Sequence, residues 1–127
     1  MDRVIVDTSS ILLGFENGKS VFEAIIGQLG ARSVLVSKGI INELDTISKS
    51  KGTRGADARA ALRELSLKKI RIEADSKYPD SWIMERAAES GVSAVVTNDT
   101  KLALEIRKRE EVDVFKFSRE GKLKRLR

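Results

Sequence analysis

Short runs of β-branched and apolar residues alternate along the chain with longer segments of helical periodicity, and this alternation constrains the fold most. Val4-Ile5-Val6 and Ala94-Val95-Val96 have the length of buried strands. Elsewhere apolar residues recur at spacings of three and four, as in Ile40, Leu44 and Ile47. The pattern predicts strands over residues 3–6, 33–36, 70–72, 94–97 and 112–117, and helices over residues 19–29, 38–48, 56–67, 79–90 and 100–109.

Strands that alternate with helices are typical of a parallel sheet with helices on both faces, joined by right-handed crossovers. The length of 127 residues fits one domain, and no repeat or linker divides it. We therefore expect an α/β layered sandwich that forms a single domain over residues 1–127. The basic residues 118–127 are expected to form a loosely ordered tail.

The chain contains neither Cys nor His, which restricts the chemistry it can perform. Without Cys there is no thiolate nucleophile, disulfide or Cys-bound zinc. Without His, the usual general base at neutral pH is missing. Hydrolysis by this chain would therefore use carboxylates, hydroxyls, Lys, Tyr or a hard metal ion bound by oxygen atoms, which favours Mg²⁺ or Mn²⁺.

The net charge of +5 suits a polyanionic partner such as RNA. Residues 49–71 contain eight basic and two acidic residues, and residues 116–127 contain six and one. Basic side chains in these segments are expected to contact the RNA backbone: Lys49, Lys51, Arg54, Arg59, Arg63, Lys122, Lys124 and Arg125. A solvated charged surface is the alternative explanation for both segments.

Four acidic residues are expected at the carboxyl ends of the strands, where open α/β sheets bind their ligands. Asp7 and Asp99 follow the first and fourth predicted strands. Glu43 lies about one turn into the helix after the second strand, and Asp80 begins the helix after the third. Each also has a structural explanation, because Asp often caps helices and Glu43 borders an apolar stripe.

Four converging carboxylates would repel one another unless a divalent cation lay between them. Such a site suits two-metal phosphodiester cleavage, in which one ion lowers the pKa of water and the other stabilises the leaving 3′-oxygen. The polar residues Thr8, Ser9, Thr97 and Asn98 adjoin the acids and could hold water or phosphate. A role in turns and helix caps is the alternative for them.

Four sequence blocks together resemble the PIN-domain family over residues 3–117: Val4-Ile5-Val6-Asp7-Thr8-Ser9, Ile41-Asn42-Glu43-Leu44, Asp80-Ser81-Trp82-Ile83 and Val95-Val96-Thr97-Asn98-Asp99. The resemblance implies a three-layer α/β/α sandwich with a central five-stranded parallel sheet, a Mg²⁺ or Mn²⁺ site and endoribonuclease activity. It also implies that Asp7, Glu43, Asp80 and Asp99 are the catalytic, metal-binding acids. The third block of the family often has paired acids before its helix, whereas Asp80 follows Tyr78-Pro79, so Asp75 is a second candidate there.

Within the family, the basic loop after Glu43 and the segment 97–102 resemble archaeal proteins related to ribosomal-RNA processing nucleases. VapC-type toxins are the second choice, and a non-catalytic RNA-binding or assembly module is a third. The partners considered are RNA, a second copy of the chain, and an antitoxin or ribosome-assembly factor. No apolar run is long enough for a membrane span, and no secretory leader follows Asp2, so a cytoplasmic protein is expected.

Overall fold

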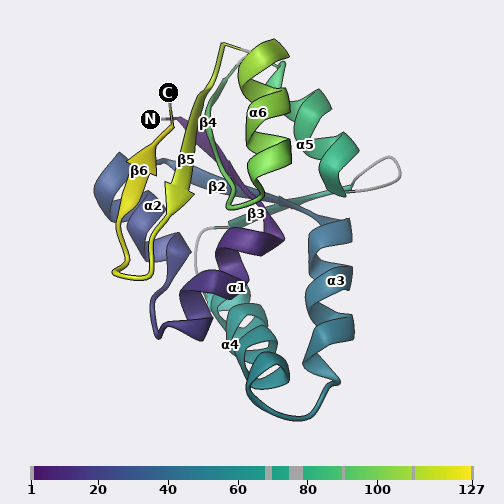
Figure 1. Cartoon of the computed structure of the whole chain (residues 1–127). Helices are drawn as coiled ribbons and strands as arrows, with labels where there is room; N and C mark the ends of the chain where they lie inside the picture. Colours follow the sequence, from purple (N-terminus) through teal and green to yellow (C-terminus); the bar gives the residue numbers. More distant parts are fainter. Residues whose placement is uncertain (1, 68–69, 75–78, 90, 110, 127) are drawn as a thin grey trace.

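The computed structural model describes residues 2–67, 70–74, 79–89, 91–109 and 111–126 (Figure 1). Strands and helices follow one another along this part of the chain. They are β1 (Arg3–Val6), α1 (Thr8–Glu16), α2 (Val21–Leu29), β2 (Ser33–Ser37), α3 (Lys38–Ser48), α4 (Thr53–Leu67), β3 (Ile70–Glu73), α5 (Pro79–Ala87), β4 (Val92–Val96), α6 (Thr100–Arg109), β5 (Asp113–Phe117) and β6 (Leu123–Arg125).

The strands form one sheet in the order β3-β2-β1-β4-β5-β6. The first five of these are parallel, and β6 runs antiparallel to β5. In the central strand β1, Val4, Ile5 and Val6 are β-branched and fully buried. Such strands are typical of a parallel sheet covered on both faces. The expected α/β sandwich with five parallel strands is confirmed, with one antiparallel strand added at its edge.

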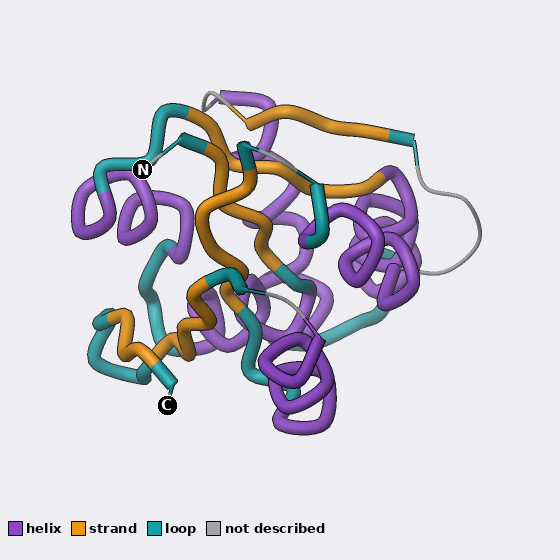
Figure 2. The backbone as a smooth tube through the Cα atoms, turned by 90° about the horizontal axis from the view of Figure 1, so that it is seen from above, coloured by secondary structure: helices purple, strands orange, loops and turns teal. Residues whose placement is uncertain are grey.

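Helices α5 and α6 cover one face of the sheet, and α1 to α4 lie on the other (Figure 1; Figure 2 shows helices on both sides of the strands). From β1 the chain moves outward to β2 and β3, and then returns to place β4 on the other side of β1. The strand order therefore reverses between β1 and β4. In open α/β sheets the crevice at such a reversal, at the carboxyl ends of the strands, is where ligands bind.

Helix α1 is not predicted by the sequence pattern, which indicates a turn over residues 14–18. The structure continues as helix through Gly14 to Glu16, and Asn17 is its C-cap. A Cβ atom at Gly14 would lie 2.6 Å from the carbonyl oxygen of Lys19 and 3.0 Å from the Phe117 ring. Gly14 therefore allows close packing inside a helix, where its sequence neighbours suggest a turn.

Strand β6 lies in the segment that is expected to be a loosely ordered tail. Its backbone pairs with β5. The Gln28 side chain of α2 bonds to the turn of the hairpin through both its nitrogen and its oxygen. The Gln28 amide donates to the Gly121 carbonyl at 2.8 Å and accepts from the Leu123 N–H at 3.0 Å. Leu123 and Leu126 pack against the core, a pattern that the surrounding basic residues hide in the sequence.

Helices α3 and α4 form a hairpin that projects beyond the sheet (Figure 1). Its tip is packed, although the sequence predicts a loop over residues 49–55 that is too polar to pack. A Cβ atom at Gly55 would lie 2.0 Å from the Ser50 carbonyl oxygen, so only glycine fits there. Arg59 of α4 donates to the carbonyl of Ser48 at 2.6 Å and so caps the end of α3. Helix α4 therefore begins at Thr53, three residues earlier than expected.

An ion pair with two hydrogen bonds joins α5 to the edge strand β3. Arg86 donates from Nε and Nη2 to the two carboxylate oxygens of Glu73, at 2.7 and 3.2 Å. It also donates to Glu89 at 2.9 Å. The Arg86 side chain is only 11% exposed and that of Glu73 19%, so solvent screens their attraction weakly. The hydrogen bond from Arg86 lowers the pKa of Glu73 below its usual value of 4.5.

Replacing Glu73 by Gln should lower the free energy of unfolding near neutral pH by about 1–3 kcal/mol, because Arg86 would keep only the more exposed Glu89 as its charge partner. A lowered pKa means that the stabilisation is present above pH 4.5 and is lost as the pH falls through the folded-state pKa. The difference between wild type and variant should therefore shrink in urea denaturation at about pH 3. Glu89→Gln is the control, and its more exposed carboxylate should matter less. An equal loss at both pH values would contradict the ionic role of Glu73.

Candidate active site

Asp7 follows strand β1 directly, and its carboxylate is the buried centre of the candidate site. The residue is 6% exposed. One carboxylate oxygen, Oδ1, accepts from the N–H of Thr8 at 2.9 Å. The other, Oδ2, accepts from the hydroxyls of Ser9 at 2.7 Å and Thr97 at 2.9 Å. Three donors therefore stabilise the buried negative charge, which would otherwise be costly.

The segment after β4 is bonded directly to this carboxylate, because β1 and β4 are neighbours and Val6 pairs with Val96. The Thr97 hydroxyl, which donates to Asp7, also accepts from the Asp99 N–H at 3.1 Å. The Asn98 N–H donates to the Ser9 hydroxyl at 3.0 Å. Asp99 then caps α6 by accepting from the Leu102 N–H at 3.1 Å. Asp99 is thus held beside Asp7 by hydrogen bonds of the residues between them.

The Asn98 side chain is fully used in joining β4 to β5. Its Oδ1 atom accepts from the Ser10 hydroxyl at 2.6 Å and from the Phe117 N–H at 3.1 Å. Its Nδ2 atom donates to the Phe117 carbonyl at 2.8 Å. Asn98 therefore positions the loop, and Ser10 is a buried partner that sequence reasoning misses. A polar residue in the first turn of an unpredicted helix carries no signal by which it could be found.

Asp80, in the first turn of α5, lies within the electrostatic reach of both other aspartates. Partial burial raises the pKa of Asp80 most, and the negative charges of Asp7 and Asp99 raise it further. Asp80 and Asp99 also line one cleft of about 260 Å³ together with Lys101, Glu105 and Arg109. These three charged residues of the cleft are not singled out by the sequence pattern.

Each of the three aspartates lies at the N-terminus of a helix. Asp7 and Asp99 cap α1 and α6, and Asp80 is in the first turn of α5. The partial positive charge at a helix N-terminus stabilises a carboxylate by about 0.3–1 kcal/mol. The capping roles considered for Asp7 and Asp99 are therefore present, and the charges of both residues still act on Asp80.

Glu43, the fourth predicted acid, is an exposed residue of α3, the helix that follows β2 directly. It interacts with other residues of the structure. The other candidate for the third block, Asp75, lies outside the described residues.

The donor atoms of the site suit a hard divalent cation, because they are carboxylate and hydroxyl oxygens. Among the residues that the structure describes, however, no three acids are grouped closely enough to hold a metal ion as they stand. Asp80 and Asp99 are exposed, so rotation about their side-chain bonds is open to them. The buried Thr8 hydroxyl, next to Asp7, has no hydrogen-bond partner in the described structure. The ligand atoms of the site therefore suit a divalent cation. The acidic side chains would have to move closer together to bind it.

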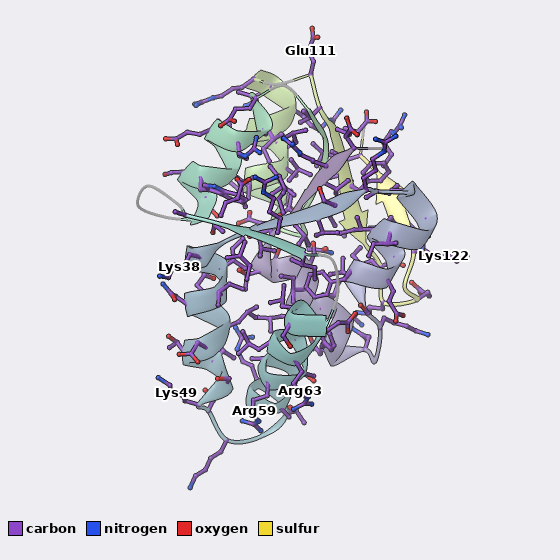
Figure 3. All side chains as sticks on the ribbon, turned by 180° about the vertical axis from the view of Figure 1, so that it is seen from behind. Lys38, Lys49, Arg59, Arg63, Glu111 and Lys122 are labelled. Atoms are coloured by element: carbon purple, nitrogen blue, oxygen red, sulfur yellow. The ribbon has the colours of Figure 1, made fainter. Side chains whose placement is uncertain are left out.

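The predicted RNA-binding residues fall into two regions, the α3–α4 hairpin and the β5–β6 hairpin (Figure 3 labels Lys49, Arg59, Arg63 and Lys122). Some of them also have structural contacts. Arg59 caps α3, and Lys49 lies 3.5 Å from Asp45. Arg125 pairs with Asp113 at 3.1 Å and lies over the Phe115 ring. The remaining predicted cations are exposed: Lys51, Arg54, Arg63, Lys122 and Lys124.

A family model described as "PIN like domain" matches residues 4–118, which is nearly the whole chain. The chain belongs to the PIN-like domain family. The sequence resemblance is thereby confirmed, and the fold agrees with it. No curated protein matches the chain in sequence.

Solved structures with the same fold include the PIN domain endonuclease Utp24. It is 24% identical with a TM-score of 0.77, and the match covers 98% of this chain and 92% of that one. A domain of a functionally unknown protein from Methanocaldococcus jannaschii is 16% identical with a TM-score of 0.63, covering 93% and 92%. At these identities the likeness establishes the fold of this PIN-like domain. None of the helices in its described residues is long and apolar enough to cross a membrane.

Replacing Asp80 by Asn should stabilise the protein near neutral pH in a buffer without divalent cations. A raised pKa means that the ionised carboxylate destabilises the folded state at pH values above that pKa, whereas the effect is absent below the usual value of 3.8. We expect the melting temperature to rise by roughly 1–3 °C at about pH 7 and to be unchanged at about pH 3. Asp57→Asn, on α4, is the matched control and should give no rise. A lower melting temperature for Asp80→Asn at pH 7 would argue for a purely structural role in α5.

Proposed function

We propose that this PIN-like protein is a metal-dependent endoribonuclease that hydrolyses phosphodiester bonds in RNA, with Mg²⁺ or Mn²⁺ as cofactor. The observation that carries the proposal is that Asp7 and Asp99, which follow β1 and β4, both act electrostatically on Asp80 at the start of α5. The charges of Asp7 and Asp99 raise the pKa of Asp80, so the three acids share one electrostatic environment. Like charges gathered in this way are unfavourable unless a cation binds them.

The family supports the proposal from a second direction. Utp24, which shares the fold over almost the full length of both chains, is described as a PIN domain endonuclease. The absence of Cys and His leaves oxygen ligands and carboxylate acid–base chemistry as the means of hydrolysis. The net charge of +5 suits an RNA substrate.

In the proposed mechanism, Asp7, Asp80 and Asp99 would hold the cation. Glu43, on α3, would be the fourth acid. A bound divalent cation would lower the pKa of the attacking water and would offset the negative charge of the phosphate. The hydroxyls of Ser9 and Thr97 fix the orientation of the Asp7 carboxylate by donating to it. Asp80, an exposed carboxylate in the cleft that Asp99 also lines, would accept a proton from the attacking water. Lys101, in the cleft with Asp80 and Asp99, offers a positive charge for the substrate phosphate.

Within this proposal we favour structured RNA, such as a ribosomal-RNA precursor, over the substrate of a VapC-type toxin. The support is the basic α3–α4 hairpin beside the site, whose exposed cations include Lys51, Arg54 and Arg63. The second candidate is a non-catalytic RNA-binding or assembly module. It is favoured by one observation, that no three described acids are yet grouped to hold a metal ion.

Cleavage assays with a structured RNA distinguish these functions. Wild type should cut the RNA internally with Mn²⁺, and EDTA should abolish cutting. Asp99→Asn should reduce the cleavage rate by about 100-fold or more, because a group that stabilises the transition state is lost. Asp57→Asn, the same change on α4, should cut normally. Cleavage by Asp99→Asn at the wild-type rate, or the same cleavage in EDTA, would contradict the proposed mechanism.

Binding of Mn²⁺ should also be visible without RNA. A ligand that binds only the folded state raises its stability, by about 2.7 kcal/mol at a concentration 100 times its dissociation constant. We expect Mn²⁺ to raise the melting temperature of the wild type and to raise that of Asp7→Asn much less. If both proteins gained equally, the ion would bind elsewhere on the chain.

A further inference from the structure

The β5–β6 hairpin contains an unfavourable contact between two lysines. Lys116 of β5 lies directly opposite Lys124 of β6 in the antiparallel ladder. Like charges in this position destabilise a sheet, by a fraction of a kcal/mol up to about 1 kcal/mol. Neither lysine belongs to any of the ion pairs found among the described residues. A local rule of strand pairing that is broken in this way often indicates a functional site.

Both lysines line a cleft of about 490 Å³ at the carboxyl end of β5. Arg119 adds a third positive charge to its wall, and Leu13 of α1 and Asn98 also line it. The volume lies in the range of sites for small ligands, about 300–1,000 Å³, and so suits a unit of the size of one nucleotide.

This cleft adjoins the acids of the candidate active site through consecutive residues. Asn98 lines the basic cleft, and the next residue, Asp99, lines the cleft that also contains Asp80. Consecutive Cα atoms are about 3.8 Å apart. The hydrogen bonds of Asn98 to Ser10 and Phe117 hold this junction in place. A chain of phosphates in the basic cleft would therefore pass next to the loop that carries Asp99.

One acidic side chain, the exposed Glu120, also lines the cleft. Hydrogen bonds from its own backbone N–H and from Ser118 lower the pKa of Glu120, and the charges of Lys124 and Arg119 lower it further. The cleft wall therefore carries three positive charges and one negative charge, which leaves it positive.

We infer that the β5–β6 hairpin forms a binding cleft for the RNA backbone, in which Lys116, Lys124 and Arg119 contact phosphates next to the bond that is cut. The inference rests on the proposed ribonuclease function and extends it by naming the path of the substrate. RNA fits better than an acidic protein because the cations line a cleft that opens beside a carboxylate site for phosphodiester cleavage. Phosphate contacts of this kind position the substrate and do not read its sequence.

The hairpin is anchored independently of the two lysines, which makes them suitable for substitution. Gln28 holds the hairpin on α2, and Arg125 pairs with Asp113 across the strands. Replacing both lysines by Gln removes their repulsion, so the variant should fold and melt at the wild-type temperature or higher.

The test measures binding by fluorescence anisotropy in EDTA, so that cleavage plays no part. The probe is a labelled 2′-O-methyl RNA of about 12 nucleotides, titrated at salt concentrations between about 50 and 200 mM. For Lys116→Gln/Lys124→Gln we expect about a tenfold loss of affinity. The slope of log affinity against log salt should fall by roughly 1 to 1.5, because each phosphate contact with a single strand contributes about 0.7.

The matched control is Arg32→Gln/Lys108→Gln, which removes the same charge from exposed residues outside the cleft. It should lose no more than about twofold in affinity. An equal loss of affinity in both double variants would contradict the proposed binding cleft, because the net charge alone would then explain RNA binding. Competition by polyglutamate as strong as that by unlabelled RNA would also overturn it, in favour of an acidic protein partner.

The binding-cleft proposal and the nuclease proposal can be contradicted independently of each other. If Asp99→Asn abolishes cleavage while the cleft variant binds the probe like its control, the enzyme stands and the cleft is wrong. If no variant or metal ion yields cleavage while binding still depends on Lys116 and Lys124, the cleft is retained for RNA binding and the nuclease proposal falls.

Discussion

The parallel pairing of β1 with β4 is the constraint on which the rest of the molecule depends. It brings the Thr97 hydroxyl within 2.9 Å of the Asp7 carboxylate across 90 residues of chain. From this contact follow the position of Asp99 at the start of α6 and the junction that Asn98 makes with β5. If β4 were not adjacent to β1, the acids would belong to separate helix caps and would share no site.

Much of the fold and part of the site are predictable from the sequence, because they depend on local rules. Buried β-branched runs predict β1 and β4, and Asp7 and Asp99 follow from the rule that ligands bind at the carboxyl ends of strands. Other features depend on tertiary contacts that no local pattern contains. Gly14 is typical of a turn until its close contact with Lys19 is known. The opposition of Lys116 and Lys124 depends on a register that only the folded hairpin defines.

The three aspartates and the cations of the β5–β6 hairpin occupy separate parts of one edge of the sheet, and Lys101 and Arg109 line the cleft of Asp80 and Asp99. The aspartates lie at the ends of β1 and β4 and at helix N-termini, where helix dipoles reduce their mutual repulsion. The cations of the β5–β6 hairpin lie one strand further along the same edge. Among the residues that the structure describes, none of the three aspartates forms an ion pair, although the net charge of the chain is +5.

The packed tip makes the α3–α4 hairpin a rigid arm of fixed length. Because Gly55 admits the Ser50 carbonyl and Arg59 caps α3, the hairpin has little freedom to bend at its end. The 11 residues of α3 correspond to about 16 Å of helix. At roughly 3.4 Å per nucleotide, a strand would need about five nucleotides to reach from one end of the helix to the other. An arm of fixed length would therefore make the affinity for RNA depend on the length of the substrate as well as on its charge.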